Sequence, residues 1–255
     1  MGREIDRRTF NKWAALASVG FVGFGAGALT RLITHQREVE DIIVKSRCPE
    51  NFFDPEHIRR VEEATYPIVA QVGTDYFLGT SWIISKTDTG VSVVTCEHLL
   101  IEGKYRAQQI SLIAPVTLLS ESFESLGRDT AIVTFPYAQT VNIPNLPQPL
   151  DIKYDYTPEI GEQLLIVGYS DVSENSTITD IKPIPRVLVV DSTQKEYFSG
   201  YADVSGGMSG SAAVTFDGNQ PCVVALAYST RDFFGKRVTC QPLTSGTQTQ
   251  RASIR

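Results

Sequence analysis

Histidine is scarce in this sequence, and its four cysteines stand far apart. The 255 residues include only three histidines, and no C-x-x-C pair or histidine at metal-ligand spacing accompanies the cysteines. Zinc sites need such spacing, so we expect no metal and no other cofactor. Lys and Arg are scattered along the chain, and the net charge is -6. Because nucleic-acid binders concentrate positive charge, we expect no nucleic-acid partner.

A strong helical period is absent from residue 66 onward. In its place the chain has short β-branched runs between turn signals, among them YPIVAQV, YFLGTSWIIS, TAIVTF and CVVALAYS. Many short strands at close spacing are typical of an antiparallel barrel or sandwich. With 42% hydrophobic residues, the chain can bury a sizeable core.

Four segments are predicted along the chain. Residues 1–30 are an export signal or signal anchor, and residues 31–65 are a polar stalk with a short helix around HIRRVEEA. Residues 66–244 form the β-rich body, and the Pro-rich stretch 141–149 is the predicted crossing between its two halves. The polar tail, residues 245–255, is expected to be disordered.

The N-terminus has the features of an export segment. Arg7 and Arg8 form a pair that is followed by Phe10, by Lys12 and by a Gly-rich apolar run over residues 13–29. This pattern resembles the twin-arginine translocation motif, and the run is short for a membrane span. An uncleaved signal anchor, attached to the membrane, is the alternative. Both interpretations place the body outside the cytoplasm, in the periplasm or secreted.

A location outside the cytoplasm favours disulfide bonds between the cysteines. In an oxidising environment Cys222 and Cys240 are expected to bridge neighbouring strands, and Cys48 to tie the N-terminal segment to Cys96. Three connectivities are open from the sequence alone. Buried free thiols are the alternative.

A loop rich in glycine and serine, residues 203–211 (DVSGGMSGS), precedes the strand-like run AAVTF. Dense glycines let the backbone turn sharply and direct N–H groups inward. A serine hydroxyl is a poor nucleophile by itself, and it needs both a neighbouring base and donors that stabilise an oxyanion. The loop supplies such donors around Ser209, although a plain turn between strands has the same composition.

His98 and Asp129 supply the remaining chemistry. His98 ends a β-branched run and is the only histidine of the β-rich body, so it is the candidate base with a near-neutral pKa. Asp129 stands directly before the run TAIVTF. The chain order of His98, Asp129 and Ser209 matches one known triad arrangement, in which the acid orients the base and the base activates the serine.

Five segments in a fixed order carry a family resemblance. They are FLGTSWII, VVTCEHLL, DTAIV, EIGEQLLIVGYS and GGMSGS, spread over residues 66–240. In these segments the chain resembles the trypsin-like peptidases of the chymotrypsin superfamily, and within it the bacterial exported Deg-type proteases. The resemblance implies an all-β fold of two six-stranded antiparallel Greek-key barrels, about 66–140 and 150–244, with the active site in the cleft between them.

The resemblance also implies an activity, that of a serine endopeptidase acting on proteins or peptides through an acyl-enzyme. Ser209 is the implied nucleophile, His98 the general base and Asp129 its orienting carboxylate. The N–H groups of Gly207 and Ser209 are the implied oxyanion hole.

Substrate contacts are implied at two further places. The segment Leu226-Ala227-Tyr228 matches the strand that pairs with the substrate backbone. Asp203 matches the base of the specificity pocket, where a carboxylate favours Lys or Arg substrates. Met208 stands where zymogen-activated relatives carry an acid, so activation by a cut N-terminus is not expected.

Three other kinds of protein are alternatives to a peptidase. A catalytically inactive, peptide-binding barrel is the main alternative, although all three triad residues are retained. A structural envelope protein has no need of the triad order. An α/β-hydrolase requires a G-x-S-x-G elbow and a later histidine, and no histidine follows Ser209. The sequence carries no signal for an oligomeric state.

Overall fold

The computed structural model describes residues 26–114, 117–120, 122–136, 139, 146–169, 182–229 and 237–244. Two compact units divide the chain, Met1–Asp41 and Ile42–Arg255, and both β-sheets belong to the second unit. The predicted tail, and the predicted export segment as far as residue 25, lie outside the described residues.

Helices occupy most of the described residues ahead of the first strand, residues 26–64. Helix α3 begins where the Asp54 carboxylate accepts a hydrogen bond from the Glu56 N–H at 2.8 Å and Pro55 fills the first turn. Its buried residues are Ile58 and Val61, the apolar positions of the predicted helical pattern. None of the helices within the described residues is long and apolar enough to cross a membrane. The helices with described bounds are α2 (Ala26–Lys45), η1 (Pro49–Asn51), α3 (Pro55–Glu63) and η2 (Glu97–Leu99).

The first sheet is a curled half-barrel of eight strands in the order β4-β5-β1-β2-β3-β8-β7, with β6 paired to β5. Its neighbours are antiparallel, and the β-branched strand β3 is buried along its whole length, which explains its unbroken apolar sequence. Its strands are β1 (Thr65–Val72), β2 (Asp75–Thr87), β3 (Gly90–Cys96), β4 (Ile101–Glu102), β5 (Tyr105–Ile113), β6 (Thr117–Ser120), β7 (Phe123–Gly127) and β8 (Thr130–Pro136).

The second sheet closes into a six-stranded barrel. Its order is β13-β10-β11-β12-β15-β14-β9, and the additional pairing of β13 with β14 completes the ring, while β9 adds a short parallel edge to β14. Its strands are β9 (Asp151–Ile152), β10 (Gln163–Gly168), β11 (Ile184–Thr193), β12 (Phe198–Tyr201), β13 (Ser211–Asp217), β14 (Gln220–Ser229) and β15 (Arg237–Pro242).

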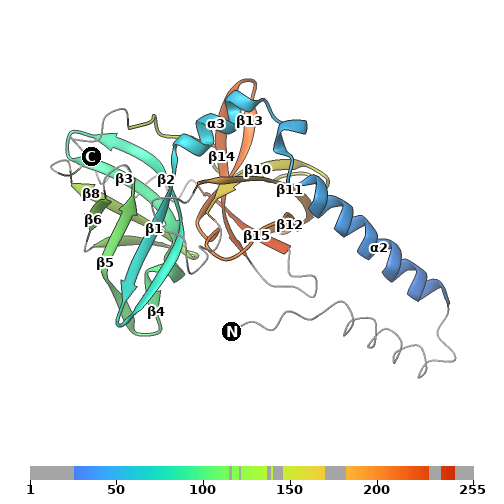
Figure 1. Ribbon diagram of the computed structural model, residues 1–255, viewed down its shortest axis with the longest axis horizontal. Helices are drawn as coiled ribbons and strands as arrows, with labels where there is room; N and C mark the ends of the chain where they lie inside the picture. The colour runs from blue at the N-terminus through green and yellow to red at the C-terminus, as the bar shows by residue number, and fades with distance from the viewer. Residues whose placement is uncertain are drawn as a thin grey trace. The chain divides into compact units, whose positions relative to one another are not determined.

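One hydrophobic cluster extends across both sheets, and a second one fills the interior of the second barrel. Trp82 and Ile83 of β2 are fully buried, and their cluster extends to Leu165 of β10 and Val214 of β13. The sheets lie side by side, on the left and right of Figure 1. The predicted all-β, chymotrypsin-like architecture with two barrel-like sheets is therefore confirmed. It differs in detail, because the described strands at the ends of the first sheet, β4 and β7, are not paired with each other.

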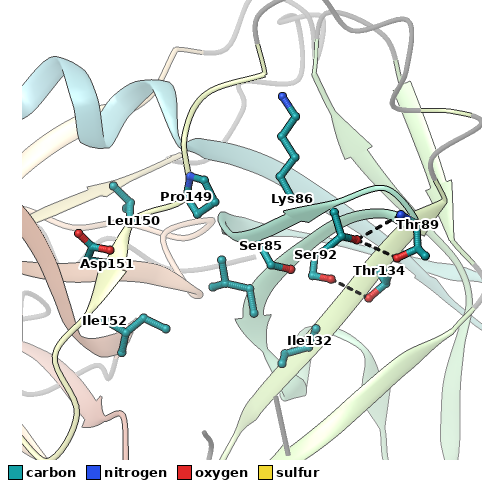
Figure 2. Close-up of a pocket in the computed structure, with 12 residues that line it drawn as sticks. Ser85, Lys86, Thr89, Ser92, Ile132, Thr134, Pro149, Leu150, Asp151 and Ile152 are labelled. Atoms are coloured by element: carbon teal, nitrogen blue, oxygen red, sulfur yellow. Dashed lines mark hydrogen bonds between the residues drawn. The ribbon is translucent and has the colours of Figure 1, made fainter. Parts of the chain in front are cut away.

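A cavity of about 310 Å³ opens between the first sheet and the chain leading into the second. Figure 2 shows Ser85, Lys86 and Thr89 on one side of it, with Pro149 and Asp151 on the other. Of the residues predicted to carry chemistry, none lines this cavity. The candidate site lies elsewhere, at the contact between the two sheets.

Candidate active site

The loop that carries Ser209 joins β12 to β13 and is held between the two sheets. The Ser209 carbonyl accepts a hydrogen bond from the Thr80 N–H of β2 at 2.8 Å. On the other side, the Gly210 N–H donates to the Ala227 carbonyl of β14 at 2.9 Å. Gly210 has φ +94°, and a β-carbon there would lie 2.0 Å from the Thr80 carbonyl oxygen. Only glycine fits this close approach.

His98 and Asp129 form a pair in the first sheet. His98 lies in η2 directly after β3, and Asp129 lies in the turn between β7 and β8. The Asp129 Oδ2 lies 2.7 Å from the His98 Nδ1, and Oδ1 accepts the His98 backbone N–H at 2.8 Å. The Asp129 carbonyl also accepts the Glu97 N–H at 3.0 Å. The carboxylate therefore fixes both the main chain and the ring of His98.

The turn before Asp129 has a strained backbone. Arg128 and Asp129 are consecutive non-glycine residues with φ of 51° and 58°, in the left-handed region. Aspartate is among the residues that tolerate this region best, and its two hydrogen bonds to His98 compensate for the strain. The arrangement is typical of a functional position.

The Ala227 carbonyl contacts both the loop that carries Ser209 and the segment that leads to His98. This carbonyl accepts the Gly210 N–H, and it lies 3.8 Å from the Sγ of Cys96, two residues before His98. Within the described residues no hydrogen bond joins the Ser209 hydroxyl to His98. Serine and histidine of such sites often make their contact only when substrate is bound. The structure thus brings His98 and Asp129 together, and the loop that carries Ser209 contacts the same strand as Cys96, β14.

Cys96 lies beneath the pair, a placement that the sequence did not suggest. Its Sγ and the ligand atoms of His98 and Asp129 lie within 4.8 Å of one another, a donor set of the kind that binds metal. Burial, reinforced by the Asp129 charge, raises the pKa of the Cys96 thiol well above its usual value. The thiol therefore stays protonated near neutral pH, and His98 Nδ1 is already engaged by Asp129. Both features disfavour metal binding at this position.

The two predicted oxyanion donors, the N–H groups of Gly207 and Ser209, bind no acceptor among the described residues. Gly207 has φ +89°, and its carbonyl accepts the Thr80 hydroxyl at 2.8 Å. The Met208 carbonyl accepts the Ser211 hydroxyl at 2.7 Å, so the Ser209 N–H of the same peptide unit points the opposite way. Among the described residues no acceptor binds the N–H groups of Gly207 and Ser209. Both are available to an oxyanion.

Thr80, which the sequence did not indicate, holds the loop that carries Ser209. It is fully buried, its hydroxyl donates to the Gly207 carbonyl, and the same oxygen accepts the Tyr169 N–H at 2.9 Å. Its main chain holds Ser209, as described above. The signal was present, because Thr80 belongs to the FLGTSWII segment, but a threonine in a strand gives no indication of contacts across 127 residues of sequence.

Thr80→Val is expected to lower kcat about 10-fold with little change in KM. Valine keeps the shape but leaves the Gly207 carbonyl and the Tyr169 N–H unpaired, at a cost of about 1 to 3 kcal/mol each. Steady-state kinetics on a peptide substrate measure the effect. Thr80→Ser keeps the hydroxyl and serves as the control. Equal kcat in Thr80→Val and the wild type would contradict the role given to this hydroxyl.

The pairing of the predicted substrate strand changes at Ala227. Leu226 and Ala227 are paired on both sides, with β13 and with β15, and are buried. The pairing with β13 ends at Ala227, whereas Tyr228 continues to pair with Thr239 of β15. Within the described residues, the side of β14 that pairs with β13 therefore has no strand partner from Tyr228 onward.

Asp203 lies at the start of the nucleophile loop and faces two arginines. Its Oδ2 is 2.7 Å from the Arg47 Nε and 3.9 Å from the Arg186 Nε. A small apolar pocket lies between the loop and the second barrel, and Asp203 is not among its lining residues, which are Ile166, Val204, Met208, Ala227, Tyr228 and Val238.

The predicted disulfides are wrong, because all four cysteines are free. Cys222 and Cys240 do lie on neighbouring strands, but the register pairs Cys240 with Ala227, five positions from Cys222. Cys48 precedes η1, next to the second sheet, whereas Cys96 ends β3 of the first sheet. The strand register, which the sequence does not reveal, determines the separation of Cys222 and Cys240.

Unreduced, denatured protein is expected to take up four iodoacetamide groups. The folded protein should react first at the part-exposed Cys48 and Cys222, because Cys96 and Cys240 are buried and burial raises the pKa of both buried thiols. Intact mass with peptide mapping measures the labels. Fewer than four labels in the denatured, unreduced sample would contradict the free thiols.

Comparisons with known proteins identify the family and the fold of the chain. The profile of the family described as "Trypsin-like peptidase domain" matches residues 79–226. No curated protein matches the chain. Among solved structures, the thermostable serine protease AL20 from an extremophilic microorganism is 12% identical, with a TM-score of 0.58 over 76% of this chain and 98% of that one.

Two further solved structures show the range of this fold. The scabies mite inactivated protease paralogue S-I1 is 16% identical, with a TM-score of 0.58 over 77% of this chain and 96% of that one. The serine endoprotease from Yersinia pestis is 19% identical, with a TM-score of 0.56 over 78% of this chain and 65% of that one. At such identities the likeness is one of fold.

Proposed function

Since the chain belongs to the family of trypsin-like peptidase domains, we propose that it is a serine endopeptidase that uses Ser209, His98 and Asp129. The observation that carries the proposal is the double contact of Asp129 with the ring and the main chain of His98, at 2.7 and 2.8 Å. A histidine oriented in this way presents its Nε2 toward a nucleophile. A histidine with a purely structural role does not require this double contact with a carboxylate.

The proposed reaction proceeds through an acyl-enzyme. The Ser209 Oγ attacks the peptide carbonyl carbon while the His98 Nε2 takes the hydroxyl proton, and Asp129 stabilises the resulting imidazolium. The N–H groups of Gly207 and Ser209 bind the oxyanion of the tetrahedral intermediate. The C–N bond then breaks as His98 returns its proton to the amine. Water, activated by His98, hydrolyses the acyl-enzyme in the second half.

Substrate binding is proposed at the edge of β14. A peptide in extended form would add beside Tyr228, next to the nucleophile loop. The role of Asp203 in selecting Lys or Arg stays a prediction, and Arg47 competes for the same carboxylate.

Cleavage of a mixed peptide library, followed by mass spectrometry, tests both the activity and its preference. Wild-type protein is expected to cut internal bonds, and Ser209→Ala is expected to cut none. Cleavage after Lys and Arg that disappears in Asp203→Asn would support the basic preference. Release of single terminal residues alone would contradict an endopeptidase.

A location outside the cytoplasm is proposed on the twin-arginine-like motif and the apolar run that follows it. Replacement of Arg7 and Arg8 by lysine is expected to retain the protein inside cells that have a twin-arginine pathway. Fractionation of cells that produce the two forms measures the distribution. Equal export of both forms would contradict the motif.

A further inference from the structure

We propose that Ser46 and Arg47, which follow helix α2, are positioning residues that hold the nucleophile loop in its active form. The inference rests on the proposed peptidase function. It concerns a segment that lies outside the β-sheets and outside the residues matched by the family profile. The contacts between this segment and Asp203 carry it.

Asp203 opens the loop that contains Ser209, and three of its groups are held. Its N–H donates to the Ser46 hydroxyl oxygen at 2.9 Å. Its carboxylate accepts the Arg47 Nε–H at 2.7 Å, and its carbonyl accepts the Arg186 Nε–H at 2.9 Å. A residue bound by main chain and side chain at once has little freedom to turn.

The segment that holds Asp203 is itself fixed on the second barrel. Ser46 is 1% exposed, and its hydroxyl donates to the Ile43 carbonyl at 2.7 Å, which leaves the oxygen to accept the Asp203 N–H. The Ser46 carbonyl accepts the Val187 N–H of β11 at 3.0 Å. The clamp, defined as Ser46 and Arg47, is therefore anchored to strand β11 and reaches Asp203 from there.

The charges make Arg47 necessary to this arrangement. The Asp203 side chain is only 12% exposed, and a carboxylate so little hydrated needs a close cationic partner. Arg186 is a second cation near this carboxylate, but its Nε lies 3.9 Å from the carboxylate oxygen, against 2.7 Å for Arg47. We therefore expect the loss of Arg47 to change the position of the Asp203 side chain at the start of the loop.

Two main-chain hydrogen bonds inside the loop join residues two or three positions apart: the Val204 N–H donates to the Ala202 carbonyl at 3.0 Å, and the Met208 N–H donates to the Ser205 carbonyl at 3.4 Å. Contacts with residues outside this stretch hold its two ends, through the clamp at Asp203 and through Thr80, Ser211 and Ala227 around residues 207–210. Because Ser46 directly follows α2, the position of the helix end and the geometry of the oxyanion donors are linked.

The test compares full-length wild type, Arg47→Ala, Arg47→Lys and Arg59→Ala. Arg59 is the matched control, because it is similarly exposed and pairs with Glu56 on α3, away from the loop. Arg47→Ala is expected to lower kcat and the rate of fluorophosphonate labelling about 10-fold, with KM changed less. Arg47→Lys is expected to recover part of the loss, and Arg59→Ala to match the wild type. Thermal unfolding of each variant shows that it is folded.

A folded Arg47→Ala that labels as fast as the wild type would overturn the clamp. In the double variant Arg47→Ala with Asp203→Asn, a loss no greater than that of Arg47→Ala alone would support action through Asp203. If the wild type does not label, the peptidase proposal fails separately. Hydrogen exchange then decides on the clamp: faster exchange of residues 203–209 in Arg47→Ala supports it, and unchanged exchange overturns it.

Discussion

Ser209→Ala is expected to lower kcat/KM for peptide hydrolysis about 10⁴- to 10⁶-fold. The alanine removes the only atom that forms the acyl-enzyme, while the loop keeps its main-chain bonds to Thr80 and Ala227, so the fold should be unchanged. Residual activity arises from the oxyanion donors and from substrate binding. Steady-state kinetics on a cleaved library peptide measure the effect.

Ser205→Ala is the matched control for that experiment, since it removes a hydroxyl from the same loop. It is expected to keep activity within about 2-fold of the wild type, because only the Ser205 carbonyl contributes a loop contact. Equal losses in Ser205→Ala and Ser209→Ala would contradict the special role of Ser209. They would show that the loop responds to any substitution.

Asp129→Asn is expected to lower kcat about 10⁴-fold with little loss of stability. The His98 backbone N–H fixes the side-chain orientation, because it needs an oxygen at the place of Oδ1. The asparagine NH₂ then faces the His98 Nδ1, which must act as acceptor. This puts the ring proton on Nε2, where it prevents His98 from taking the proton of Ser209.

Asp155→Asn provides the control, because Asp155 also has a positive φ, of 56°, and lies away from His98. Asparagine tolerates this conformation, so both variants are expected to remain folded. Asp155→Asn should keep wild-type kcat. If Asp129→Asn also kept it, the carboxylate would have no part in orienting His98.

The sequence predicted those parts of the structure that depend on local pattern. Short β-branched runs such as those around Val93 and Ile166 appear as β3 and β10. The position of His98, Asp129 and Ser209 beside β-branched runs predicted that each lies at the end of a strand. The structure has His98 in the short helix η2 after β3, Asp129 in the turn before β8 and Ser209 in the loop before β13. Periodicity and turn residues act within a few positions, so they can be read from the sequence.

Contacts between distant parts of the chain could not be predicted in this way. Arg47 and Asp203 are separated by 156 residues, and Thr80 reaches the Gly207 carbonyl across 127. The disulfide prediction failed for the same reason, because the strand register that separates Cys222 from its neighbours is set by tertiary packing. These contacts are the ones that fix the nucleophile loop.

Reaction of the full-length chain with a fluorophosphonate probe tests the central claim most directly, because only an activated serine reacts rapidly. We expect a single adduct per molecule by intact mass, which maps to Ser209 and is absent from folded His98→Ala. A folded wild type without an adduct, or an adduct that persists in Ser209→Ala, would contradict an activated nucleophile at Ser209.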